Sequence, residues 1–135
     1  MAHRVKLESS VFEHSLTLLQ EFYAAGHRII ISFSGGKDSG VCLELCLLAA
    51  RETGRLPVEV VFQDEEIAYP GTIEYVERVA AREDVNFHWL VMYQPMVNIF
   101  NRAMPYFWCF DPLLAPEQWV RQPPLSMEMR SEINI

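Results

Sequence analysis

Six consecutive residues carry the groups best suited to chemistry in this chain: Ser34, Gly35, Gly36, Lys37, Asp38 and Ser39. The two glycines have no Cβ, so the backbone around them can adopt positive φ angles and present N–H groups to an anion at close range. Lys37 adds a mobile ammonium group, and the serines add hydroxyl donors. Asp38 beside a phosphate suits either a helix cap or a metal ligand. These residue types predict a phosphate-binding loop; the alternative is a Gly-Gly turn with a surface lysine.

The segments on both sides of this loop predict the elements that would position it. Residues 28–33 are largely apolar and β-branched, which is typical of a buried strand, and residues 39–53 are rich in helix formers. A strand, a glycine turn and a helix start in this order direct the helix's unpaired N–H groups and the positive end of its dipole toward one point. The spacing differs from the Walker motif Gly-x-x-x-x-Gly-Lys-Ser/Thr, so we expect a phosphate site of another kind.

Four further residues are candidates for the same site. Asp64 follows a predicted strand at 56–62, where it could bind Mg²⁺ or a ribose hydroxyl, or be an ordinary loop acid. Arg102 and Arg121 have guanidinium groups that match phosphate oxygens and could close over the phosphates; the alternative is that they are surface arginines. Cys109 lies outside any predicted core helix, which makes it the candidate thiol nucleophile.

Other acidic and thiol-bearing residues are given structural roles. Glu65 and Glu66 are interpreted as solvated charges. Cys42 and Cys46 are interpreted as small buried hydrophobes of one helix face, since no histidine or third cysteine follows at the spacing of a metal site. Three cysteines without a CxxC pattern indicate a reducing compartment.

The whole sequence predicts helices and strands in alternation, which indicates an α/β fold with a parallel sheet and right-handed crossovers. Ligands of such sheets bind beyond the carboxyl ends of the strands, where both the loop and Asp64 would lie. We expect helices at about 10–25, 39–53 and 70–83, strands at 28–33, 56–62 and 86–92, and a short helix around 96–103. Residues 1–122 are assigned to one domain, and residues 123–135 to a tail that is either disordered or docks on a partner.

Length and composition narrow the class of protein. At 135 residues, half of them hydrophobic, the chain can bury a core as a single domain. Its net charge is −7, which disfavours a nucleic-acid surface because such surfaces normally carry a basic patch. No apolar run is long enough to span a membrane, and the N-terminus lacks the apolar core of a signal peptide, so we expect a cytoplasmic protein.

The chain resembles the phosphoadenosine phosphosulfate (PAPS) reductase family of the PP-loop superfamily. The loop at 34–39 matches the pyrophosphate loop of that superfamily, and residues 61–76 match a strand that ends in aspartate and an aromatic-Pro-x-Thr segment that opens the next helix, here Asp64, Tyr69, Pro70 and Thr72. Residues 107–112 and 117–121 look like one branch, typified by an immunoglobulin-binding regulator and by phage homologues. The resemblance covers about residues 28–122.

The resemblance implies an adenine nucleotide α-hydrolase-like fold, with a five-stranded parallel sheet between helices, and a site for ATP or PAPS. It implies either ATP pyrophosphatase chemistry or sulfonucleotide chemistry, as an oxidoreductase or a transferase, with Lys37, Asp64 and Cys109 as catalytic candidates. Mg²⁺ at Asp38 and Asp64 is the accompanying metal. The alternative is a regulatory subunit that senses a nucleotide and acts with a partner. We also expect a homodimer or a partner protein.

Two departures from the family's reductases matter. The chain has no Cys-Gly-Leu-His segment near its end, and it has no cysteine pairs that would hold an iron–sulfur cluster. We therefore expect no iron–sulfur cluster, and no reduction of PAPS by the route that uses a C-terminal cysteine.

Overall fold

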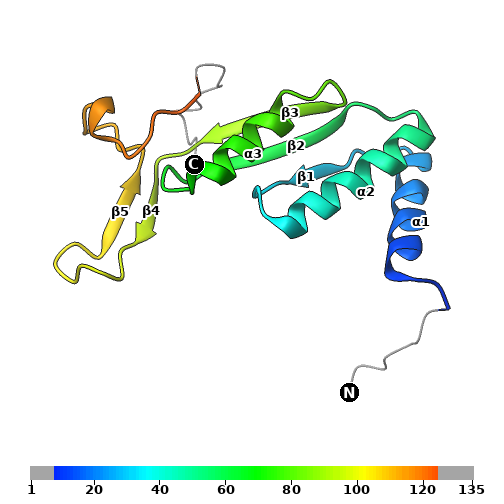
Figure 1. Ribbon diagram of the computed structural model, residues 1–135, viewed down its shortest axis with the longest axis horizontal. Helices are drawn as coiled ribbons and strands as arrows, with labels where there is room; N and C mark the ends of the chain where they lie inside the picture. The colour runs from blue at the N-terminus through cyan, green and yellow to red at the C-terminus, as the bar shows by residue number, and fades with distance from the viewer. Residues whose placement is uncertain (1–7, 125–135) are drawn as a thin grey trace.

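The computed structural model describes residues 8–124 and alternates strands with helices as the sequence predicts (Figure 1). Tail residues 125–135, which were expected to be disordered or to dock on a partner, lie outside the described part. The elements are α1 (Val11–Ala24), β1 (Ile30–Ser32), α2 (Lys37–Thr53), β2 (Val58–Asp64), α3 (Pro70–Ala80), β3 (Val85–Val91), β4 (Gln94–Val97), β5 (Tyr106–Cys109) and the 3-10 helix η1 (Pro116–Gln118).

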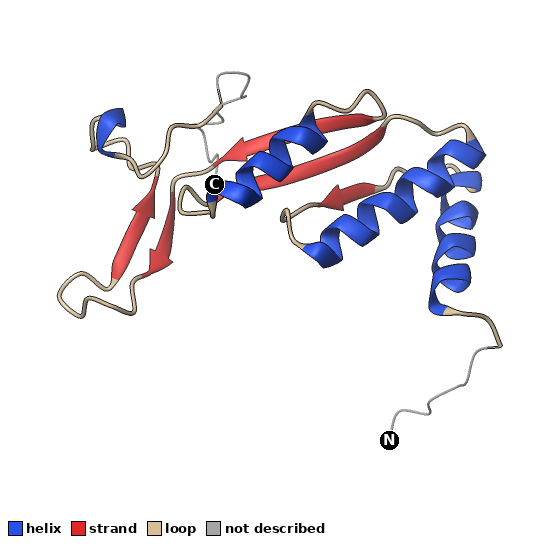
Figure 2. Ribbon diagram, in the orientation of Figure 1, coloured by secondary structure: helices blue, strands red, loops and turns tan. Residues whose placement is uncertain are grey.

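Strands β1, β2 and β3 form a parallel sheet in that order, which confirms the α/β fold class. Ile31 lies opposite Val60, and Val60 lies opposite Phe87. The sheet has three strands within residues 8–124, not the five that the resemblance implied. Helices α2 and α3 cover one face of this sheet, as Figure 2 shows. The strand side chains on that face, such as Val58, Val60 and Phe62, form the core with both helices.

Helix boundaries follow local sequence signals. The Ser10 hydroxyl and the Glu13 carboxylate form a capping box at the start of α1, as expected. Gly54 ends α2 in the left-handed conformation, with φ of 67°. The predicted packing of the second helix is confirmed, because α2 contacts the sheet on one side and α1 on the other. Among residues 8–124, no helix is long and apolar enough to cross a membrane.

The short helix expected at 96–103 is wrong, because β4 and β5 form an antiparallel hairpin there. Gln94 lies opposite Cys109, and Val97 lies opposite Tyr106. Proline at 95 lacks the N–H that a helix interior uses, and Pro95 takes part in the hairpin instead. In the connecting loop, Asn98 and Asn101 accept hydrogen bonds from nearby backbone N–H groups, which favours a turn over a helix.

Candidate functional site

The glycine loop, residues 34–39, joins the end of β1 to the first turn of α2. The Phe33 N–H donates to Val61 O at 2.8 Å, so the pairing with β2 continues up to the start of the loop. Helix α2 begins at Lys37, and its N-cap is Gly36, which offers no side-chain cap. Asp38 lies within the first turn, so the alternative that it caps the helix is wrong. The first backbone N–H groups of this 17-residue helix therefore find no side-chain hydrogen-bond acceptor on the cap residue.

Hydrogen bonds between the two serines and the backbone fix the shape of the glycine loop. The Ser34 and Ser39 hydroxyl oxygens lie 3.1 Å apart, and the Ser39 hydroxyl donates to Gly36 O at 3.0 Å. The Ser34 hydroxyl accepts the Gly36 N–H, and the Ser39 hydroxyl accepts the Ser34 N–H, each at 3.3 Å. The loop thus holds its conformation without a bound anion, which lowers the cost of binding one.

Gly35 is the residue of the loop that requires glycine. Its φ is +73°, and a Cβ at this position would lie 2.7 Å from Thr72 Cγ2 and 3.0 Å from Val76 Cγ2. Helix α3 therefore packs directly against the backbone of the loop. Gly36, by contrast, has φ of −84°, so the positive φ expected as an option for both glycines occurs in the loop only at Gly35.

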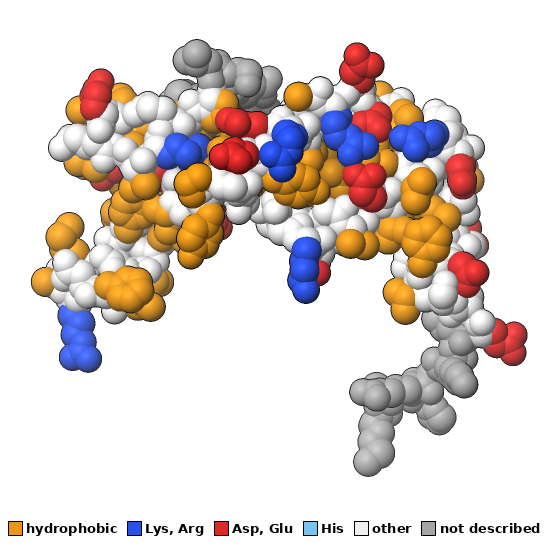
Figure 3. All heavy atoms as spheres, in the orientation of Figure 1, with side chains coloured by type: hydrophobic (Ala, Val, Ile, Leu, Met, Phe, Trp, Pro, Cys, Tyr) orange, Lys and Arg blue, Asp and Glu red, His pale blue; other side chains and the backbone are white. Residues whose placement is uncertain are grey.

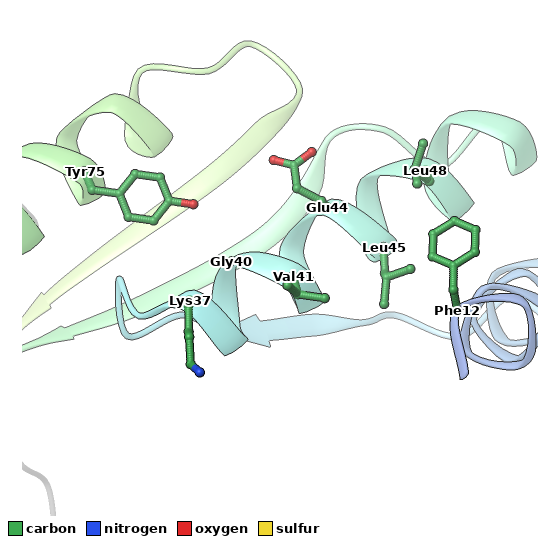
Figure 4. Close-up of a pocket in the computed structure, with 8 residues that line it drawn as sticks. All are labelled: Phe12, Lys37, Gly40, Val41, Glu44, Leu45, Leu48 and Tyr75. Carbon is green, nitrogen blue, oxygen red and sulfur yellow. The ribbon is translucent and has the colours of Figure 1, made fainter. Parts of the chain in front are cut away.

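Lys37 is exposed at the first position of α2. Figure 4 shows its side chain extending from the start of α2 away from Tyr75, with the ammonium group clear of the other labelled residues. Within residues 8–124, Lys37 takes part in no ion pair. Its charge is thus available to an anion at the helix start.

Asp64 ends β2 at the same edge of the sheet as the glycine loop. Its side chain is fully buried, and its oxygens already accept hydrogen bonds from other residues. Trp89 Nε1 donates to Oδ2 at 2.8 Å, and the Glu66 N–H donates to Oδ1 at 2.9 Å. Arg121 also donates to Oδ1, which brings this predicted arginine to the carboxyl edge of the sheet as the partner of Asp64. A carboxylate enclosed by three donors, one of them a cation, does not fit a Mg²⁺ ligand. Asp38 remains exposed.

Glu66 is the residue that sequence reasoning missed, since it was interpreted as a solvated charge. It is 2% exposed, and its carboxylate accepts hydrogen bonds from the backbone N–H groups of Phe110 and Val120. Its burial continues the alternation of β2, in which every second residue from 58 to 64 is buried, so this two-residue period is the signal that could have identified it. Glu65, in contrast, is exposed as expected. Glu66 therefore anchors the segment that carries Arg121.

The thiol candidate lies in an environment that opposes nucleophilic chemistry. Cys109 is fully buried, and its Sγ donates to Glu65 O at 3.1 Å. Burial, with the nearby carboxylates of Glu66, Glu65 and Asp64, raises the pKa of the Cys109 thiol to about 11, so the thiol stays protonated near neutral pH.

The other two cysteines differ from each other, although both were expected to be buried. Cys42 is exposed, so that expectation is wrong for it. Cys46 is buried as predicted, and burial raises its pKa to about 11. Within residues 8–124, no group of three or more His, Cys, Asp or Glu side chains could hold a metal ion.

Arg102 is not brought to the glycine loop of its own chain. It lies in the loop between β4 and β5, and Figure 1 shows that loop directed away from the start of α2. The structure thus gathers the glycine loop and the start of α3 at one edge of the sheet, together with Asp64 and Arg121. It leaves Arg102 exposed at the end of the hairpin.

Comparison with known proteins gives the family. The model of the phosphoadenosine phosphosulfate reductase domain matches residues 28–107, more than half of the chain. The chain is also 38% identical over 102 residues to the uncharacterized protein YbdN of Escherichia coli (strain K12), a match that covers 72% of the chain and 24% of YbdN. The chain thus spans about a quarter of the length of this relative. The resemblance seen in the sequence is confirmed: the chain belongs to the phosphoadenosine phosphosulfate reductase family, and its function is of the nucleotide-binding kind that this family implies.

Proposed function

We propose that the glycine loop is a PP-loop that binds the phosphate end of an adenine nucleotide, either ATP or PAPS. The observation that carries this proposal is the packing of Gly35, whose positive φ and contact with Thr72 hold the loop backbone against α3. The start of α2 then faces the loop with N–H groups that its cap residue does not satisfy. Such a helix start favours an anion, both through hydrogen bonds and through the helix dipole.

Each nucleotide implies a different use of the same groups. With ATP, Lys37 and the loop N–H groups would stabilise the charge that grows on departing pyrophosphate. With PAPS, the loop would hold the anionic end of the nucleotide, and the attacking thiol would come from a partner, because Cys109 is buried and protonated. Arg121 is the proposed second cation of the site, held by Asp64. Asp38 is the exposed carboxylate that suits a nucleotide-bound Mg²⁺.

A regulatory subunit that binds a nucleotide without turning it over is the second candidate. The burial of Cys109 favours it, since this thiol cannot reach a bound substrate in the described structure. Assays for pyrophosphate released from ATP, and for sulfite released from PAPS with a thiol reductant added in place of the partner's thiol, separate the candidates. Product release supports an enzyme, whereas binding without release of either product supports the regulatory subunit.

The test of the binding site is calorimetric titration of the wild type and of Lys37→Ala with ATP and with PAPS. Loss of a charged hydrogen-bond donor should weaken binding by roughly 10- to 100-fold, which corresponds to about 1.5–3 kcal/mol. The melting temperature should barely change, because Lys37 is exposed.

Arg28→Ala is the matched control. It removes the same charge from the opposite end of β1, where Arg28 is an exposed partner of Glu59 at 3.6 Å. Affinity should be retained in this variant. Undiminished affinity in Lys37→Ala would overturn the assignment of the loop.

A further inference from the structure

The hairpin of β4 and β5, residues 94–109, projects from the rest of the molecule as an arm (Figure 1). Its two strands pair with each other, and its base is tied to the core by buried Cys109 and by Met96 and Phe107, which pack against the core. No other helix or strand of residues 8–124 packs extensively against the rest of the arm. Other apolar side chains of the arm are highly exposed: Val97 73%, Ile99 76%, Phe100 94%, Met104 64% and Tyr106 58%. An exposed patch of this kind marks an interaction surface.

The tip of the arm is ordered by its own hydrogen bonds. The Asn98 N–H donates to Pro105 O at 2.8 Å, which closes the loop. The Asn101 side chain accepts the Ala103 N–H at 3.0 Å, and the Asn98 side chain accepts the Phe100 N–H at 3.2 Å. The loop therefore presents Phe100 in a fixed conformation, which reduces the entropic cost of inserting it into a partner.

The arm also differs in charge from the rest of the chain. Residues 92–110 contain no acidic residue and a single basic one, Arg102, in a protein of net charge −7. The partner that fits this arm has an apolar hollow and a carboxylate beside it.

A hollow of this description lies on the outer surface of α2. The groove has a volume of about 330 Å³ and is lined mainly by apolar side chains from α1 and α2, among them Phe12, Val41, Leu45 and Leu48, and Lys37 at the start of α2 also lines it (Figure 4). Glu44 also lines the groove with its side chain 57% exposed, and its carboxylate pairs with Arg82 at 2.7 Å. The groove thus combines an apolar hollow with a carboxylate that an incoming guanidinium would share with Arg82.

The arm and the groove lie too far apart to meet within one chain. Figure 3 shows apolar side chains gathered over the arm and over the α1–α2 end on the same face, at opposite ends of the molecule. This placement suits a two-fold axis between two copies, since a single rotation then forms two identical contacts.

We propose that two copies of this chain exchange arms, each inserting Phe100 into the α2 groove of the other. Arg102 of one copy then lies beside Glu44 of the second copy. The arm gains apolar cover for the side chains that residues 8–124 of its own chain leave exposed, and both contacts form in one closed dimer.

Light scattering on the full 135-residue chain tests the dimer. The wild type should be a dimer, and Phe100→Asp should weaken association by at least about 100-fold, because a carboxylate would be buried in an apolar groove. Leu113→Asp is the control: Leu113 is 87% exposed but lies outside the arm, so this variant should remain dimeric. A monomeric wild type at every concentration, or a dimer unaffected by Phe100→Asp, would overturn the proposal.

Charge reversal tests which surfaces meet. Arg102→Glu and Glu44→Arg should each weaken self-association, since each homodimer would oppose like charges at both contacts. An equimolar mixture of the two variants should dimerise again, because both contacts of the mixed dimer then pair opposite charges. Circular dichroism should show both variants folded, as Arg82 keeps its partner Asp84 when Glu44 is changed. A mixture that does not associate would contradict arm exchange.

Discussion

At the scale of single residues, the carboxyl end of β2 holds two buried carboxylates within three residues. Asp64 and Glu66 are 0% and 2% exposed, and Arg121 forms an ion pair with Asp64. Burial of a carboxylate is unfavourable unless its oxygens accept hydrogen bonds. Here Asp64 accepts an indole N–H and Glu66 accepts two backbone N–H groups. The pair therefore ties residues 110–121 to the sheet.

Glu66→Gln should weaken the attachment of residues 110–121 to the sheet. A glutamine side chain keeps the shape but directs an NH₂ group at one of the two backbone N–H donors, from Phe110 or Val120. We expect a loss of about 1–3 kcal/mol in the free energy of unfolding, measured in urea. Trypsin should also cleave faster after Arg121.

Glu65→Gln is the matched control for this change, since the Glu65 carboxylate is exposed. Its backbone oxygen, which accepts the Cys109 thiol, is unaltered by the substitution. Stability should change by less than about 0.5 kcal/mol. Equal losses in the two variants would show that the buried carboxylate has no special role.

At the scale of the elements, the contact between the glycine loop and α3 fixes the site. Gly35→Ala should destabilise the protein by about 2–4 kcal/mol, because it combines a positive φ with a Cβ placed 2.7 Å from Thr72 Cγ2. Gly54→Ala separates the two causes: Gly54 has a similar φ of +67°, but nothing lies within 4 Å of its Cβ position. That control should cost only about 1–2 kcal/mol, by the same denaturant measurement.

Adding Thr72→Ser to Gly35→Ala should recover part of the loss, because serine lacks the methyl group that the new Cβ meets. The double-mutant cycle should give a favourable coupling of about 0.5–2 kcal/mol. Strict additivity of the two changes would show that the loop can move away from α3.

The elements between residues 10 and 92 could be predicted because each depends on a local signal. The Ser10–Glu13 capping box and Gly54 each mark a boundary that the structure keeps. The apolar run before the glycine loop predicted a strand at 28–33, and β1 occupies the shorter range Ile30–Ser32 within it. The hairpin could not be predicted in the same way, since its pairing joins Gln94 to Cys109 across a loop and leaves most apolar side chains exposed. No amphipathic period marks such a segment.

The same distinction holds for the site. Residues 34–39 form a contiguous loop, so their types and spacing predicted where it would lie. The roles of Glu66 and Arg121 depend on contacts across more than 40 positions of sequence, which no local pattern encodes. Cys109 was the candidate nucleophile because it lies outside every predicted core helix. Its burial comes instead from packing beside the end of β2, which the sequence around it does not indicate.

At the scale of the whole molecule, the carboxyl ends and the amino ends of the parallel strands have different roles. The glycine loop and Asp64 lie at the carboxyl ends of the strands. The polar contacts at the opposite edge join β2 to β3: Glu59 contacts His88 at 2.7 Å, and the Val58 N–H donates to Asp84 O at 3.0 Å. Changes at the amino ends should therefore alter stability and leave the proposed nucleotide site intact.

Two carboxylates at that edge should control how stability depends on acid pH. The bidentate hydrogen bonds of Arg82 lower the pKa of Asp84, and hydrogen bonds with His88 and Asn86 lower that of Glu59. Because both pKa values are lower in the folded protein, the stabilisation is complete above about pH 5 and is lost as the pH falls through the folded pKa values.

The double variant Glu59→Gln/Asp84→Asn tests this dependence. Its free energy of unfolding should be lower than the wild type's at pH 7 by about 0.5–1 kcal/mol for each pair, and the difference should shrink as the pH falls below about 4. Urea unfolding at a series of pH values measures both effects. Glu77→Gln, on the exposed surface of α3, removes one carboxylate as a control and should leave the wild-type curve unchanged. A double variant that loses the same amount of stability at pH 3 as at pH 7 would show that these carboxylates do not cause the acid sensitivity.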